Sequence, residues 1–297
     1  MKTKKSTANF MWVSIIAAIL TILFKFLGYK ATNSIGMLSD ALESFVNLAS
    51  AVIGLRLIKI AERPPDNKHP FGHAKAEYFA SLIEGVLILI AALGIIYSAV
   101  NRIINQQQIQ DINLGIFYSL IATIINVLTA IFLLNKAKRY NSIALEADGK
   151  HLLTDVVTSI GVIFSVLLIK ITNWYLIDPI VGIIVSIWII ITGIKLIKKS
   201  IDGLMDSALS KDDLEKIKRI LDTYNDKGIG YHALYTHKMS AQKYISMHLI
   251  FPKDWTIKEG HDITKEIEHK ILKDFPLSHV IIHMEPENDN ESFDDYL

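Results

Sequence analysis

Two long apolar stretches of the chain carry the same polar pattern, and this repeat constrains the fold more than any other feature. The matched residues lie 108 positions apart, and they are Asp40 with Asp148, Glu43 with His151, and Asn47 with Asp155. Steps of three and four residues place each trio on one helical face. A charged side chain near the centre of a bilayer costs on the order of 3 kcal/mol. Such residues indicate a function, and oxygen and imidazole ligands indicate a cation.

The apolar residues are concentrated in the first two-thirds of the chain, although 51% of all residues are hydrophobic. Roughly 20 mainly apolar residues suffice to cross a bilayer as a helix. Six such segments occur, near residues 9–29, 34–60, 77–101, 113–135, 144–171 and 176–197. No small-residue cleavage pattern follows the first, which favours a helix of the mature protein over a signal peptide. We therefore predict six transmembrane helices, in a transport domain of residues 1–200.

Lysine and arginine indicate the orientation, because loops rich in them remain in the cytoplasm. They gather before the first segment and after the second, fourth and sixth. The sequence thus predicts an integral membrane protein, of a bacterial-type plasma membrane, with both termini in the cytoplasm. The formal net charge of +1 indicates no nucleic-acid partner. Because the chain has no cysteine, any metal must bind to His, Asp, Glu, Asn or carbonyl oxygen.

From residue 201 the hydropathy drops, and the pattern predicts a compact cytoplasmic domain over residues 201–297. We expect helices at 211–224 and about 257–274, and strands at 231–239, 244–251 and 280–285. This α-β-β-α-β order fits a small α+β sandwich with helices on one face of the sheet, of the ferredoxin-like metallochaperone type.

Several histidines fall on the polar side of the predicted strands. His248 alternates with apolar neighbours, and His283 and Glu285 share one face of the last strand. Further potential ligands in the same domain are His232, His261 and His237. So many in one small domain favours a metal site, although any one of them taken alone is more often a surface histidine.

A tetrahedral metal site needs four converging donors, and two facing helices that each offer residues i and i+4 supply them. The four residues that meet this requirement are Glu43, Asn47, His151 and Asp155. One turn earlier, Asp40 and Asp148 are assigned a supporting role, as caps, entrance residues or proton acceptors. His-x-x-x-Asp alone is common in helices, but its duplication within the membrane is hard to explain by packing.

The loop after the second segment, RPPDNKHPFGHAKAE at residues 63–77, holds another candidate. Its two prolines end the helix and leave Asp66, His69 and His73 within reach of one another. Their spacing fits a metal site and a solvated turn equally well.

Taken together, the motifs resemble the cation diffusion facilitator family. The resemblance covers nearly the whole chain: six spans, Asp-x-x-His-x-x-x-Asp at 148–155, HPFGHAKAE at 69–77 and the His-x-Glu of the last strand. It implies a homodimer that exports divalent transition metals in exchange for protons. It also implies an interlocking salt bridge between Lys75 and Asp206. The residues that match the family's metal sites are Glu43, Asn47, His151 and Asp155 for transport, Asp66, His69 and His73 in the loop, and His232, His248, His261, His283 and Glu285 for a binuclear cytoplasmic site at the dimer interface.

The chain departs from the family pattern in the segment 34–60, where zinc-type members carry Asp or His followed by Asp. Here the pair is Glu43 and Asn47, so one carboxylate is replaced by a neutral amide. Oxygen-rich sites suit manganese and iron(II), whereas the general affinity order favours zinc. We expect Zn²⁺ first, both transported and regulatory, with Cd, Co, Fe and Mn left open.

Linkage between metal and protons predicts the mechanism. Protonation of His151 and Asp155 competes with the cation, so a site that opens alternately to each side exchanges metal for protons. The alternative is a membrane-anchored protein that senses or binds metal. We expect no enzyme, since no separate general base or substrate cleft accompanies the ligands. A channel is disfavoured because four ligands hold a transition metal too long for fast conduction.

Overall fold

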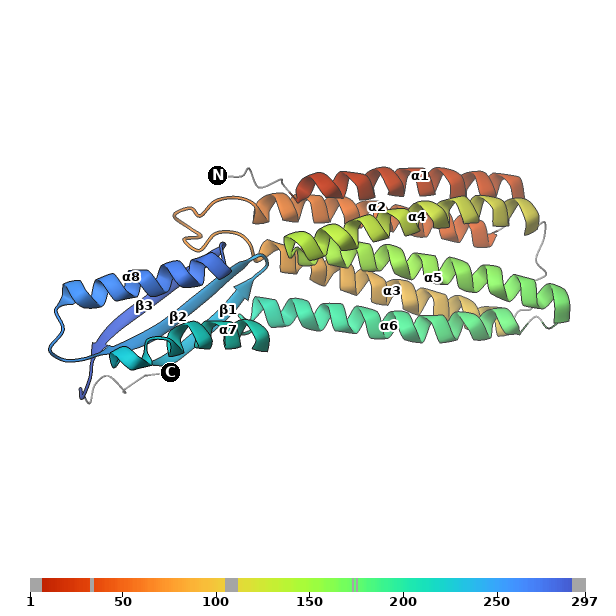
Figure 1. Ribbon diagram of the computed structural model, residues 1–297. Coiled ribbons are helices and arrows are strands. Elements are labelled where there is room, and N and C mark those ends of the chain that lie inside the picture. The colour runs from red at the N-terminus through yellow and green to blue at the C-terminus, as the bar shows by residue number, and fades with distance from the viewer. Residues whose placement is uncertain (1–6, 33–34, 105–111, 173, 175, 290–297) are drawn as a thin grey trace. The chain divides into compact units, whose positions relative to one another are not determined.

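The computed structural model describes residues 7–289 except 33–34, 105–111, 173 and 175, and at some helical positions it describes the backbone alone. The chain divides into two compact units, residues 1–201 and 202–297. Each unit is described by itself, and Figure 1 labels their elements.

The first unit is built from long helices that run side by side (Figure 1). Their bounds are α1 Ala8–Thr32, α2 Ile35–Ala61, α3 Ala76–Ile104, α4 Ile112–Tyr140, α5 Ile143–Thr172 and α6 Ile177–Leu204. Four of them, α1, α3, α4 and α6, contain stretches of 21 to 26 residues that are long and apolar enough to cross a membrane. Helices α2 and α5 are as long, at 27 and 30 residues, but they carry the charged residues of the repeated pattern. Each predicted segment coincides with one helix.

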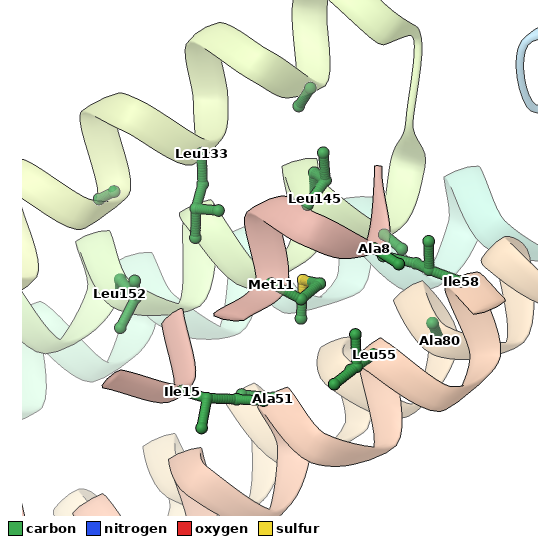
Figure 2. Close-up of a cluster of buried hydrophobic side chains, with 13 residues drawn as sticks. Ala8, Met11, Ile15, Ala51, Leu55, Ile58, Ala80, Leu133, Leu145 and Leu152 are labelled. Carbon is green, nitrogen blue, oxygen red and sulfur yellow. The ribbon is translucent and has the colours of Figure 1, made fainter. Parts of the chain in front are cut away.

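Small and branched apolar side chains join five of these helices. Helix α1 packs on α2 and α4, and α4 packs on α5. Figure 2 shows Met11 of α1 with Leu55 and Ile58 of α2 and Leu145 of α5 around it. Alanines in this cluster let the helices approach closely.

Helices α4 and α5 approach closely at Gly149, which lies between Asp148 and His151 in the polar pattern. A Cβ atom at Gly149 would lie only 2.9 Å from Cγ of Leu134 on α4. Glycine at this position therefore allows a contact between the helices that a larger residue would prevent.

The second unit is an α+β sandwich. Its elements are α7 Lys211–Asp222, the 3-10 turn η1 Asn225–Lys227, β1 Gly230–Met239, β2 Gln242–Phe251, α8 Ile257–Asp274 and β3 Ser278–Pro286. The strand order is β1-β2-β3, with β1 and β2 antiparallel and β2 and β3 parallel. The predicted elements are all present, but the first helix ends at Asp222 rather than at 224, and each strand extends one or two residues beyond its predicted bounds. Thr223 is the C-cap of this helix, and Tyr224 is the N-cap of the turn η1.

The core of the second unit lies between one face of the sheet and the two helices. Ile245, Met247 and Leu249 alternate along β2 and are buried against Ile217 of α7 and Ile267 of α8. Local caps fix where the helices start: Ser210 accepts from the backbone N–H of Asp213, and Thr256 and Glu259 form a capping box. The opposite face of the sheet is left to its polar residues.

Candidate metal sites

Three of the four predicted transport ligands come together between α2 and α5. Nδ2 of Asn47 donates to Oδ2 of Asp155 at 2.5 Å, and Oδ1 of Asn47 lies 2.8 Å from Nε2 of His151. His151 and Asp155 lie one turn apart on α5, and their side chains are only 4% and 7% exposed. Nε2 of His151 and Oδ1 of Asp155 are 3.9 Å apart. An imidazole nitrogen, an amide and a carboxylate thus share one buried spot.

The remaining residues of the polar pattern are placed less fully. The side chains of Glu43, the fourth predicted ligand, and Asp40 lie outside the described residues, although α2 contains both positions. Asp148 is buried on α5 and lies near Ser14 of α1. This position directs Asp148 toward α1, whereas His151 and Asp155 meet Asn47 of α2.

Glu84 of α3 belongs to the same polar cluster and was missed by the sequence analysis. Its Oε1 contacts Nδ1 of His151, and Oγ of Ser50 donates to its Oε2. Glu84 is 5% exposed. The signal that could have found it is its place inside an apolar span, where a carboxylate is costly unless something compensates for its charge. Asn47 and Ser50 lie three residues apart on α2, so α2 meets both ends of this cluster.

The loop between α2 and α3 brings together Asp66, His69 and His73, as predicted. Potential ligand atoms of the three side chains all lie within 4.8 Å of one another. Nδ1 of His69 is 3.2 Å from Oδ1 of Asp66, and Nε2 of His73 is 3.4 Å from Oδ2. Gly72, with φ +85, adopts a backbone conformation that lets the chain turn between the histidines.

Backbone hydrogen bonds prepare the loop carboxylate. The N–H groups of His69 and Lys68 donate to Oδ1 of Asp66 at 2.7 and 2.9 Å. The hydrogen bond from His69 is the main reason that the pKa of Asp66 is held below its usual value. The lowered pKa keeps Asp66 ionised to a lower pH than an ordinary aspartate, and a metal ligand must be ionised.

A third group lies on the polar face of the sheet. His232, His248 and His283 are register partners and form one row across all three strands. Oε2 of Glu285 lies 2.7 Å from Nε2 of His232, and Oε1 lies 2.9 Å from Nδ1 of His248. The bulge between His232 and Tyr235 alters the direction of β1 at this point.

The structure does not gather all five predicted cytoplasmic ligands. His232, His248 and Glu285 converge within 4.8 Å, whereas the His283 side chain is 65% exposed and 3.8 Å from Glu285. His261 lies on the exposed surface of α8, which packs on the opposite face of the sheet. His237 belongs instead to a second row, in which Tyr244 is stacked between His237 and His279. The predicted pair of Lys75 and Asp206 would join the two units, and it stays a prediction.

Long apolar helices that enclose a buried polar cluster, followed by a small α+β unit, are the arrangement of a membrane transport protein. Residues 11–205 match the family model of the cation efflux transmembrane domain, and residues 209–287 match that of the cation efflux protein, cytoplasmic domain. The chain therefore belongs to the cation efflux, or cation diffusion facilitator, family. The predicted fold class, a helical transmembrane domain followed by a cytoplasmic α+β domain, is confirmed.

Relatives match along almost the full length of the chain. The uncharacterized transporter sll1263 of Synechocystis sp. is 43% identical over 281 residues, which cover 95% of this chain and 91% of the relative. The cation-efflux pump FieF of Escherichia fergusonii is 27% identical over 269 residues, 91% of this chain and 89% of the pump. Protein p34 of Rickettsia prowazekii is 25% identical over 276 residues, 93% of this chain and 91% of the relative. The family is one of cation efflux transporters.

Proposed function

We propose that the protein exports a divalent transition-metal cation across a bacterial plasma membrane in exchange for protons, with Zn²⁺ as the first candidate. The observation that carries this proposal is the buried cluster of Asn47, His151 and Asp155 between two helices of the transmembrane domain. Burying charged and polar groups within a membrane costs free energy, so their presence there indicates a function. The bacterial relatives, one of them named a cation-efflux pump, support the direction of transport and the membrane.

The cluster explains how a proton and a metal would compete. Nε2 of His151 faces Oδ1 of Asn47, and Oδ2 of Asp155 accepts from Nδ2 of the same amide. A divalent cation bound here would need Nε2 free of its proton and Asp155 ionised, so binding of metal displaces protons. With Glu43 as the fourth ligand, the site would hold two carboxylates, an imidazole and an amide.

Metal choice follows from this ligand set. The amide of Asn47 lowers the negative charge of the site, and oxygen donors outnumber nitrogen donors. This suits Mn and Fe(II), but the affinity order with shared ligands still favours Zn²⁺. Cd and Co remain alternatives, and a binding assay in which the metals compete would distinguish them.

The loop and cytoplasmic groups would act as regulatory sites on the cytoplasmic side, where both termini are placed by the distribution of basic residues. The cytoplasmic group uses ligands from three strands of a domain whose family model is named for dimers. We infer a homodimer in which metal binding to this domain favours one conformation of the transmembrane helices. Such a shift requires that the metal bind the two conformations with different affinity.

A sensor that only anchors itself in the membrane is the second candidate, favoured by the converging His232, His248 and Glu285. Purified protein in proteoliposomes separates the two functions. A panel of divalent metals is offered on one side while a dye reports the internal pH. Metal uptake coupled to proton movement in the opposite direction is expected. Metal binding without any flux would overturn the transporter and leave the sensor.

A further inference from the structure

We propose that Glu84 is the positioning residue of the transport site, holding the ring of His151 so that Nε2 faces the transported cation. This inference rests on the proposed function of His151 as a transport ligand. It adds a residue from α3, a third helix, to a site that the repeated pattern drew from α2 and α5 alone.

The contacts of His151 give each ring nitrogen a different task. Nδ1 contacts Oε1 of Glu84, while Nε2 is 2.8 Å from Oδ1 of Asn47. The two nitrogens of an imidazole point in diverging directions, so one cation cannot bind Nε2 and also Glu84. Glu84 thus lies behind the ring, at the nitrogen that does not face Asn47. A carboxylate in this place fixes both the tautomer and the orientation of a histidine ligand.

The carboxylate is itself held on both sides. Its second oxygen, Oε2, accepts a hydrogen bond from Ser50 of α2, and the side chains of Glu84 and His151 are 7% and 4% exposed. Water therefore has little access to replace either contact. Because Ser50 and Asn47 both belong to α2, this helix supplies one cluster residue on each side of the imidazole. The arrangement leaves the ring one stable orientation.

Helix α3 offers a matched control. Glu77 lies two turns before Glu84 on the same helix, is buried to a similar degree, and accepts a hydrogen bond from Oγ of Ser142 at 2.6 Å. Like Glu84 it is a buried carboxylate with a serine donor. It makes no contact with His151, Asn47 or Asp155 that the structure describes. If the loss of any buried charge from α3 weakened zinc binding, substitutions of Glu77 and of Glu84 should therefore both show it.

The test uses the full-length protein with Asp66→Ala and His248→Ala, so that zinc binding reports the transmembrane site. We expect Glu84→Leu to weaken zinc binding by about 10- to 100-fold. Glu84→Gln should recover much of this loss, because its amide oxygen still accepts from Nδ1. Glu77→Gln should leave the affinity unchanged, and Ser50→Ala should weaken it less than Glu84→Leu.

A spectroscopic readout separates positioning from general stability. In the zinc-loaded protein, nitrogen NMR of His151 should show the proton on Nδ1 alone, and in Glu84→Gln the same pattern should persist. If Glu84→Leu fails to fold, Ser50→Ala and Glu84→Gln carry the test through affinity and this spectrum. Equal affinity in Glu84→Leu and the background protein, or a proton on Nε2 in the zinc-loaded protein, would overturn the inference. Unchanged affinity in His151→Ala would instead overturn the proposed transport site itself.

Discussion

At the scale of single residues, an amide links the two helices that carry the site. Nδ2 of Asn47 donates to Asp155, and its Oδ1 is placed to accept from Nε2 of His151 when that nitrogen carries a proton. An amide has both the donor and the acceptor atoms for this pairing. An aspartate at this position would have no donor for Asp155, and the two carboxylates would repel each other without a cation between them. The departure from the family pattern is therefore matched to the hydrogen bonding of the metal-free site.

Asp155→Ala should abolish metal flux in proteoliposomes while leaving an inserted, folded protein. Losing this carboxylate removes charge compensation for a cation in a buried site that no neighbour replaces. Thr154→Ala is the matched control, because Thr154 is equally buried and its hydroxyl donates to a backbone carbonyl of its own helix. Near-normal flux in Asp155→Ala would show that the transport site lies elsewhere.

Asn47→Asp should tighten binding of zinc and cadmium and change the ranking of metals more than it changes expression. The added carboxylate supplies a charge that the cation compensates, at the cost of the amide hydrogen bond to Asp155. Competition assays with a fixed panel of metals measure this ranking. The same order of metals in variant and wild type would mean that Asn47 does not tune selectivity.

At the scale of elements, patterns of apolar residues were enough to predict nearly every helix and strand. Long apolar runs and period-two alternation record burial directly, so the bounds of α8 and of the three strands were close to those observed. The sequence did not predict which side chains of different elements contact one another. Glu84 is one acidic residue on α3 with no partner nearby in sequence, and only the packing of α3 beside α5 brings it to His151. For the same reason the sequence could not show which of the cytoplasmic histidines lie together.

The contact between α7 and β2 predicts a pH dependence of stability. Burial opposes ionisation of Asp213, but the hydrogen bond and charge of Lys243, 2.7 Å away, outweigh it and lower the pKa of Asp213 below its usual value. A lowered folded-state pKa stabilises the domain above the unfolded value and loses that contribution as pH falls through the folded value. Asp213→Asn should thus cost about 1 kcal/mol at neutral pH.

Urea unfolding of a fragment of about residues 205–290, followed across pH, measures this cost. The difference between wild type and Asp213→Asn should shrink as the solution is acidified below the usual range of an aspartate. Asp222→Asn is the control, since Asp222 is exposed and meets Tyr231 rather than a lysine. A difference that stays constant at all pH values would show that the ion pair contributes nothing through ionisation.

At the scale of the whole molecule, the candidate metal sites lie in two units, and we expect each unit to have a different role in transport. The transmembrane cluster would carry the cation, and the cytoplasmic group would shift the conformational equilibrium. His248→Ala combined with His283→Ala should therefore reduce metal flux without abolishing it. The wild-type fragment of about residues 205–290 should bind zinc and should dimerise or compact when it does. The same fragment with both substitutions should lose this response.

Flux assays and calorimetry on the same variants check this division. His237→Ala with His279→Ala is a matched control, because these histidines lie in the neighbouring row of the same sheet. Zinc binding that is absent from the wild-type fragment would contradict a cytoplasmic metal site. Flux in the His248 and His283 double variant as low as in Asp155→Ala would contradict a purely regulatory role.

The row of histidines across the sheet also has a consequence for the order of folding. The hairpin of β1 and β2 forms from segments that are neighbours in sequence. Of the group His232, His248 and Glu285, it contains only the two histidines. Glu285, which contacts both, lies on β3 and reaches them only after α8 has carried the chain across to a parallel pairing with β2. Parallel pairing of distant segments is the slow step of such topologies. We therefore expect the complete group of His232, His248 and Glu285 to form late in folding, so that zinc would stabilise the finished domain rather than guide its assembly.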